Sequence, residues 1–153
     1  MKALEARIPP LVVVAILAAA MWGVRLAAAG LTATYPGRIA LTGVLFGLAL
    51  LTIAAGVREF RRAQTTLDPV HPDKATSIVD TGIYRVTRNP MYLGMLVMLL
   101  AWSAYLANPV TLAGLVIFIL YMNRFQIGPE ERALEQVFGA PYNTYRGRVR
   151  RWI

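Results

Sequence analysis

Two short segments of the 153-residue chain combine charged, aromatic and turn-forming residues in patterns that favour ligand binding. The first is Arg88-Asn89-Pro90-Met91-Tyr92-Leu93-Gly94, and the turn Gly82-Ile83-Tyr84 precedes it. The Arg offers donors to an anion, the Pro fixes a helix start whose backbone groups stay free, and Gly94 allows a ligand or a neighbouring helix to approach closely. The combination exceeds what a simple anchor requires, although each residue alone has an ordinary structural explanation.

The second segment begins at Gly128-Pro129-Glu130-Glu131, where a first-turn proline and two acids predict the start of a short helix. Gly139 is expected to end that helix, and a second, basic helix is expected over about 141–152. The apolar residues at helical spacing are Leu134, Val137 and Phe138 in the first helix, and Tyr142, Tyr145, Val149 and Trp152 in the second. Such a pair is typical of amphipathic helices at a membrane surface.

The composition indicates an integral membrane protein. Hydrophobic residues make up 57% of the chain, and 16 Lys and Arg against 8 Asp and Glu give a net charge of +8. High hydropathy with a basic excess fits basic residues on an anionic membrane face better than it fits nucleic-acid binding. The chain has no Cys and one His, His71, which excludes disulfides, thiolate metal sites, Cys nucleophiles and a His-based zinc or bis-His haem site.

Charge-free runs predict an all-α membrane protein of about four transmembrane helices, which must position the two segments. The run from Asn89 to Asn123 would be about 52 Å long as one helix, more than a bilayer needs, and Ala107-Asn108-Pro109 is expected to break it into a hairpin. We expect one domain over 1–153, with spans at about 8–30, 39–57, 90–106 and 110–127, a loop over 58–89 and a tail over 128–153. A signal peptide is the alternative for the first run, and Arg25 within its apolar region argues against it.

The distribution of charge predicts the orientation in the membrane. Of the 16 basic residues, only Arg25 and Arg38 fall on the side opposite the termini, and all eight acids fall on the termini side. The positive-inside rule makes that side cytoplasmic, so the active site and both termini are expected there, most simply at a bacterial inner membrane.

At these residues the sequence resembles the isoprenylcysteine carboxyl methyltransferase and phospholipid methyltransferase family of membrane enzymes, in its bacterial-type branch. The family pattern Arg-His-Pro-x-Tyr-x-Gly reads Arg88-Asn89-Pro90-Met91-Tyr92-Leu93-Gly94 here, with Asn89 in place of the His. The family's later acidic pair corresponds to Glu130-Glu131, and its Phe-Gly-x-x-Tyr-x-x-Tyr stretch to the segment from Phe138 to Tyr145. The resemblance covers about residues 60–153.

The resemblance implies S-adenosylmethionine (SAM) as the methyl donor, bound in a cytoplasmic pocket, and no metal. It assigns catalytic roles to Arg88 and Glu131. The residues it implies at the cofactor are Gly82, Tyr84, Asn89, Pro90, Tyr92, Leu93, Gly94, Glu130, Glu131, Tyr142 and Tyr145. Asn89 can still form hydrogen bonds, but it cannot take over a proton-transfer role of the family His.

The chemistry agrees with this implication. Tyrosine faces can hold a sulfonium by cation–π attraction, a Glu can pair an ammonium, and an Arg can pair a carboxylate. The acceptor is expected to be lipophilic or amphiphilic and to arrive from the lipid: an isoprenylcysteine-like carboxylate, a lipid amine or a small hydrophobic molecule. Membrane lipids are the expected surroundings, and no nucleic acid is expected. The alternatives are an NADPH-dependent sterol-type membrane reductase and a non-enzymatic membrane interaction protein.

Overall fold

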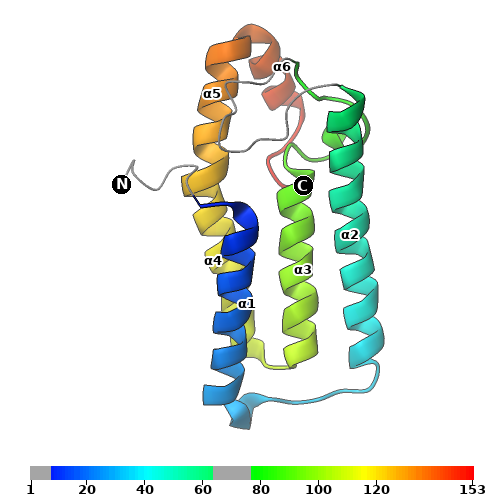
Figure 1. Ribbon diagram of the computed structural model, residues 1–153, viewed down its shortest axis with the longest axis vertical. Helices are drawn as coiled ribbons and strands as arrows, with labels where there is room; N and C mark the ends of the chain where they lie inside the picture. The colour runs from blue at the N-terminus through cyan, green and yellow to red at the C-terminus, as the bar shows by residue number, and fades with distance from the viewer. Residues whose placement is uncertain (1–7, 64–76) are drawn as a thin grey trace.

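The computed structural model describes residues 8–63 and 77–153, and within these residues it is helical with no strand. His71 and the middle of the expected 58–89 loop lie outside the described residues. Figure 1 shows the long helices running side by side, with a small helix folded over one end. The six α-helices are α1 (Pro10–Ala27), α2 (Arg38–Arg62), α3 (Pro90–Leu106), α4 (Ala113–Tyr121), α5 (Gly128–Phe138) and α6 (Ala140–Arg148).

The expected all-α membrane architecture is confirmed. Three helical stretches are long and apolar enough to cross a membrane: Pro10–Ala27, Arg38–Arg62 and Pro109–Phe138. The apolar helix α3 has 17 residues, which corresponds to about 26 Å and is slightly short of a typical hydrocarbon layer. The third expected span, at about 90–106, therefore exists as a helix that is about 4 Å shorter than this layer.

The expected break between the third and fourth spans is also present. Helix α3 ends at Leu106, Ala107 takes a left-handed φ of 52°, and Pro109 begins the 3-10 turn η5 (Pro109–Leu112). Asn108 stabilises this turn from its buried position, because its Oδ1 accepts the Val110 N–H at 3.1 Å and its Nδ2 donates to the Ala28 carbonyl at 2.8 Å. The proline and a satisfied asparagine together fix the hairpin.

The expected short helix beginning at Gly128 and ending before Gly139 is present as α5, but it is not separate, because α4 continues into it without a break. The two are joined by the π-helical segment η6 (Met122–Ile127), in which the backbone N–H groups bond one residue further back than in an α-helix. This segment widens the helix just before Pro129, so the chain passes a residue that usually ends or kinks a helix. The 30 residues from Pro109 to Phe138 span about 45 Å, so α5 lies beyond a 30 Å hydrocarbon layer.

The expected basic helix over 141–152 is also too long. Helix α6 ends at Arg148, and Val149 is extended, with φ −118° and ψ 132°. Tertiary hydrogen bonds to the carbonyls of Arg150 and Arg151 hold residues 149–153 away from the helix, against their helical pattern. Of the expected apolar residues in α5, Leu134 and Phe138 pack against Tyr142, Tyr145 and Val149, whereas Val137 is 44% exposed.

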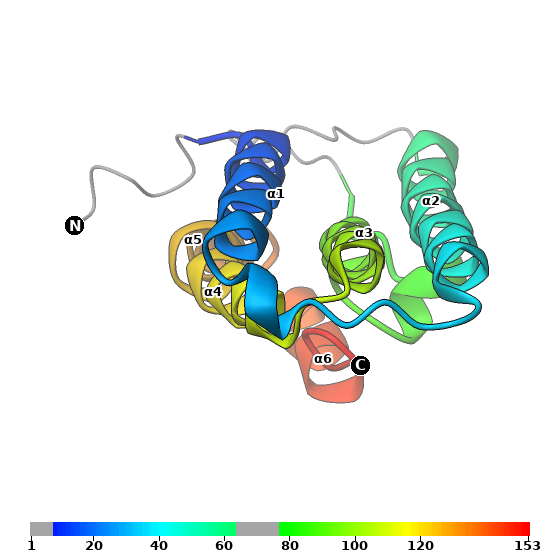
Figure 2. The same ribbon diagram turned by 90° about the horizontal axis from the view of Figure 1, so that it is seen from below.

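Helix α3 lies at the centre of the bundle, between α2 on one side and α1 with α4 on the other (Figure 2). The core is formed by buried side chains of α1, α3, α4 and η6: Val13, Leu17, Met21, Tyr92, Met95, Leu99, Leu106, Phe118, Met122 and Ile127. Gly94 is the point of closest approach to α2, because a Cβ placed there would lie 2.5 Å from Ile53 Cγ1 and 2.8 Å from the Ala49 carbonyl oxygen. Small residues permit this kind of backbone contact between membrane helices.

We expect Gly94→Ala to lower the free energy of unfolding by about 1–3 kcal/mol, because α2 and α3 must move apart to admit the methyl group. Gly43→Ala is the matched control, since a Cβ at Gly43 meets nothing within 4 Å. Unfolding of the detergent-solubilised variants by a denaturing detergent measures both. Equal stability of the two variants would show that the contact at Gly94 tolerates a side chain.

Candidate functional site

A cavity of about 310 Å³ opens where α3, α5 and α6 meet the ends of α1 and α2. Its volume lies in the range of small-molecule sites, about 300–1,000 Å³. Eight of the residues expected from the sequence line it: Tyr84, Arg88, Asn89, Tyr92, Glu130, Glu131, Tyr142 and Tyr145. The structure therefore brings together residues from η4 (Gly82–Arg85), α3, α5 and α6, over a separation of some sixty positions in the chain.

Four expected residues, Gly82, Pro90, Leu93 and Gly94, are not among those lining the cavity. Gly94 serves the contact with α2, and buried Pro90 begins α3 against Gly56. Gly82 has a positive φ of 54°, and a Cβ there would lie 2.6 Å from Glu59 Cδ. These three residues serve close packing between elements of the fold.

The apolar part of the lining comes largely from residues that the sequence analysis did not assign to the site. They are Pro9, Pro10, Leu11, Phe60, Ile78, Met91, Met95, Ile127 and Leu134. Residues 9 to 11 lie at the start of the generic first span, and Phe60 lies near the end of α2, where a loop was expected. Nothing in a uniformly hydrophobic run marks the few side chains that end beside a ligand site, and only the tertiary arrangement shows them.

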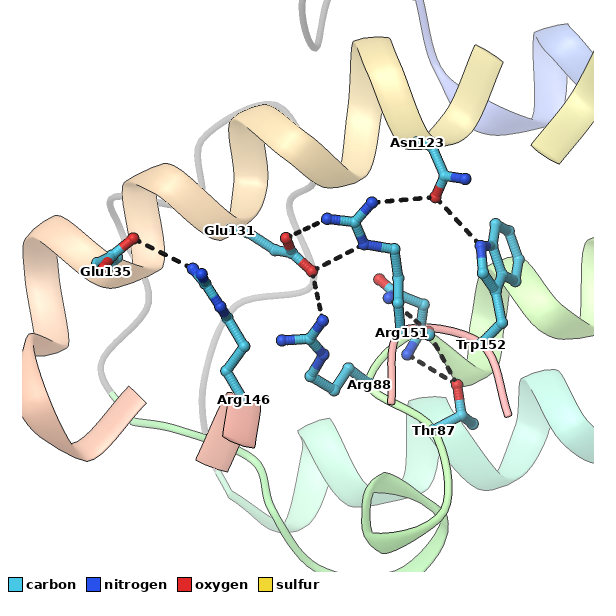
Figure 3. A network of polar contacts seen from close by, with 9 residues as sticks. Thr87, Arg88, Asn123, Glu131, Glu135, Arg146, Arg151 and Trp152 are labelled. Atoms are coloured by element: carbon cyan, nitrogen blue, oxygen red, sulfur yellow. Dashed lines mark hydrogen bonds and ion pairs between the residues drawn. The ribbon is translucent and has the colours of Figure 1, made fainter. Parts of the chain in front are cut away.

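Glu131 lies at the centre of a network of charged side chains (Figure 3). Its Oε1 contacts Arg88 Nη2 at 2.9 Å and Arg151 Nε at 3.1 Å, and its Oε2 contacts Arg151 Nη2 at 2.5 Å. The side chains of Glu131 and Arg88 are each 11% exposed, so this ion pair is largely desolvated, whereas the Arg151 side chain is 36% exposed. In this arrangement Glu131 orients two guanidinium groups, and its oxygens already have cationic partners.

Residues 149–153, which we call the strap, cross the start of α3 and contact the η6 segment. The backbone N–H of Arg88 donates to the Arg150 carbonyl at 3.0 Å, and the Asn89 side-chain Nδ2 donates to the Arg151 carbonyl at 2.9 Å. At the other end, Trp152 Nε1 donates to Asn123 Oδ1 at 3.1 Å. Asn89 thus binds the strap, and this gives a definite role to the residue that stands where the family pattern has His.

Arg88 retains two buried donors that are not satisfied. Its Nη2 contacts Glu131, but Nε and Nη1 have no hydrogen-bond partner among residues 8–63 and 77–153. A buried polar group without a partner costs about 1–3 kcal/mol, and more when it is charged. Since Arg88 lines the cavity, these donors suit an anionic group of a ligand.

Glu130 has an environment opposite to that of Glu131. The Tyr92 hydroxyl donates to its Oε2 at 3.2 Å, and no ion pair to Glu130 is present within the described part of the chain. Burial in α5, beyond the hydrocarbon layer, raises the pKa of Glu130 to about 7, and the charge of Glu131 adds to this rise against the hydrogen bond from Tyr92. A carboxylate held in this way gains most when a cation enters the cavity.

Three tyrosines supply aromatic faces next to these charges. Tyr142 and Tyr145 are buried on α6 with ring centroids 6.3 Å apart, and the Tyr145 hydroxyl donates to the Tyr84 carbonyl at 2.9 Å. Burial raises the pKa of Tyr142 to about 12 and, mainly by the same cause, raises the pKa of Tyr84 and of Tyr145 as well. All three are therefore neutral phenols at physiological pH, able to donate hydrogen bonds and to face a cation.

Comparisons with known proteins agree on one family. Residues 37–141 match the phospholipid methyltransferase family. Protein-S-isoprenylcysteine O-methyltransferase B of Arabidopsis thaliana is 27% identical over 109 residues, which cover 68% of this chain and 55% of that protein. A probable protein-S-isoprenylcysteine O-methyltransferase of Oryza sativa subsp. indica is 30% identical over 111 residues, covering 67% of this chain and 56% of that protein.

A shorter relative matches more strongly. An uncharacterized protein of Haemophilus influenzae is 49% identical over 63 residues, which cover 41% of this chain and all of that protein. The chain spans about half the length of the plant methyltransferases that it matches. No solved structure matches the chain. The family match covers more than half of the chain and includes the Arg88–Gly94 motif and the acidic pair, so this protein belongs to the phospholipid methyltransferase family.

Proposed function

We propose that this protein transfers the methyl group of SAM to a lipophilic or amphiphilic acceptor. The observation that carries the proposal is the cavity in which unsatisfied donors of Arg88, the carboxylate of Glu130 and the rings of Tyr84, Tyr142 and Tyr145 face a common space. The cationic, anionic and aromatic elements of this pocket would complement the carboxylate, the ammonium and the sulfonium of SAM, respectively.

In this proposal Glu130 and Arg88 hold the charged ends of the bound molecules, while Glu131 and Arg151 orient Arg88. SAM, when bound, supplies an electrophilic methyl group for in-line displacement. The protein then contributes alignment and exclusion of water, which account for a large part of the barrier in such transfers. This chemistry is open to a chain with one His and no Cys.

The acceptor is proposed from the shape and position of the cavity. Its apolar wall is formed by Leu11, Met91, Met95 and Leu134, close to the membrane-spanning parts of α1 and α3. An isoprenylcysteine, on which the plant relatives act by name, and a phospholipid, after which the family is named, both combine an apolar chain with a polar end. We propose an acceptor of this amphiphilic kind.

We further propose that the cavity opens at the cytoplasmic face of the membrane, in bacteria the inner membrane, with both termini on that side. Among the described residues, all acids and all basic residues except Arg25 and Arg38 lie toward the cavity end of the chain path. At the opposite end Arg25 lies over the Trp22 ring and Arg38 over the Tyr105 ring, which resembles an aromatic belt. Residues 1–153 are proposed to form one domain, since the core is shared by α1, α3 and α4.

The charged residues that line the cavity argue against the alternative of an NADPH-dependent reductase. A 2′-phosphate and a pyrophosphate would require several cations, whereas the described lining contains one arginine and two glutamates. The arginines at positions 146, 148 and 150 do not line it. The charge of the pocket thus favours a cationic cofactor over NADPH.

Calorimetric titration of the detergent-solubilised protein with SAM, S-adenosylhomocysteine and NADPH tests the proposal. We expect saturable binding of the first two and none of NADPH. Binding of NADPH alone would transfer the assignment to a reductase. Failure of a folded protein to bind any of the three would refute a cofactor site in this cavity.

A further inference from the structure

Arg151 forms two hydrogen bonds to Glu131, one to each oxygen of the carboxylate. Its Nε contacts Oε1 at 3.1 Å and its Nη2 contacts Oε2 at 2.5 Å, which is the two-pronged arrangement that arginine and carboxylate prefer. Arg88 reaches the same carboxylate end-on, through Nη2 alone and at Oε1 alone. Its Nε and Nη1 are buried and have no partner within the described part of the chain (Figure 3).

The hydrogen bonds between Glu131 and Arg151 determine how many guanidinium donors of Arg88 remain available to a ligand. With Arg151 absent, Glu131 is free to turn both oxygens toward Arg88 and to form the two-pronged pair with it. One of the two guanidinium nitrogens that are now open, Nε in a side-on pair, would then be used within the protein. Arg151 therefore keeps the two arginines in unequal roles, one fully paired and one partly open.

The strap places Arg151 where it can act in this way. Its backbone carbonyl accepts the Asn89 amide at 2.9 Å and the Thr87 hydroxyl at 3.3 Å, and its Nη1 reaches Asn123 Oδ1 at 3.4 Å. The same residue is thus fixed to the start of α3 by its main chain and to η6 and α5 by its side chain. The neighbouring Arg150 contributes a backbone carbonyl to Arg88, while the Arg150 residue itself is exposed.

We propose that Arg151 is a positioning residue, which holds Glu131 so that Arg88 presents Nε and Nη1 to the carboxylate of a bound ligand. The proposal rests on the proposed function for the existence of such a ligand. The carboxylate comes either from the amino-acid end of the methyl donor or from the acceptor.

The variant Arg151→Gln tests the proposal. Its control is Arg150→Gln, which removes the same charge one residue away. Each variant is titrated with S-adenosylhomocysteine and its carboxamide, and with farnesylcysteine and its carboxamide. In Arg151→Gln we expect about a tenfold loss of affinity for the acid of one pair and an unchanged affinity for its amide. The affected pair identifies the source of the carboxylate. Equal loss for acid and amide, or no loss for either acid, would overturn the proposal.

A measurement without ligand separates this proposal from the proposed function. In ¹⁵N–¹H spectra, the Arg88 Nε–H signal, identified by its absence in Arg88→Lys, should shift downfield in Arg151→Gln as it bonds to Glu131. It should stay in place in Arg150→Gln and return toward its original position in Arg151→Lys, which restores a cation to Glu131. An unchanged signal in a folded Arg151→Gln protein contradicts the positioning role even if the wild type binds no cofactor. Failure of the wild type to bind, with the shift present, contradicts only the proposed function.

Discussion

Replacing Arg88 by Gln should weaken ligand binding by about two orders of magnitude or more while leaving the protein folded. Hydrogen bonds to a charged group contribute about 1.5–3 kcal/mol each, and Arg88 has two donors, Nε and Nη1, available for a ligand. Glu131 keeps Arg151 as its partner in the variant, so no carboxylate is left uncompensated. The substitution also removes two unsatisfied buried donors, so we expect the melting temperature to change little.

The measurement is a pair of titrations with S-adenosylhomocysteine and with an acceptor acid, alongside thermal unfolding. Arg85→Gln is the matched control, because Arg85 lies three residues away, is exposed and does not line the cavity. Its affinity should equal that of the wild type. Wild-type affinity in Arg88→Gln for both ligands would show that the unsatisfied donors face no bound anion.

The adjacent acids show where prediction from the sequence stops. The pattern indicated a Glu-Glu pair near a cofactor, and both residues do line the cavity. Their environments differ because Glu131 is contacted by Arg88, 43 positions earlier, and by Arg151, 20 positions later, whereas Glu130 meets the Tyr92 hydroxyl. Adjacent residues lie about 100° apart around a helix, so Glu131 reaches two arginines whereas Glu130 does not. The local sequence does not indicate which of the two acids forms the ion pairs.

The helices themselves were predictable because their causes are local. A charge-free run of suitable length, and a Pro after Ala107-Asn108, dictate spans and a hairpin whatever lies around them. The expected helix from 141 to 152 failed for the opposite reason. Its residues have a helical pattern, but Asn89, Thr87 and the Arg88 N–H compete for the carbonyls of residues 150 and 151. Contacts over 60 positions decide that outcome.

The π-helical segment illustrates a third case, in which a helix continues through a sequence that normally marks a helix start. Gly128-Pro129 is a sound signal for a helix start, and the structure continues through it because η6 shifts the hydrogen-bonding partner. A π segment inserts about one residue relative to an α-helix, so it rotates everything that follows by about 100°. The direction in which α5 presents Glu130 and Glu131 therefore depends on six residues that carry no recognisable motif.

Glu130 leads to the second large effect that we expect, a dependence of cofactor binding on pH. Its pKa of about 7 means that the carboxyl group is mostly protonated at pH 6 and ionised at pH 8. An ammonium requires the ionised form, so affinity should rise about tenfold per pH unit below pH 7 and level off above it. Glu130→Gln should bind more weakly at pH 8 and should lose this dependence between pH 5.5 and 7.5.

Protein stability should change with pH in the opposite direction. The folded pKa lies above the ordinary value of 4.5, so the unfolded chain gives up its proton first as the pH rises. This group therefore favours the folded state less and less between pH 4.5 and 7, and Glu130→Gln should be more stable relative to the wild type at pH 8 than at pH 5.

The matched control is Glu135→Gln, which removes the same charge from α5 at a half-exposed pair with Arg146. Tighter binding at high pH together with lower stability of the free protein would show that the ionised Glu130 destabilises the fold, and that a bound cation offsets this effect. A pH profile that is the same in Glu130→Gln and in the wild type would assign the ammonium to another group.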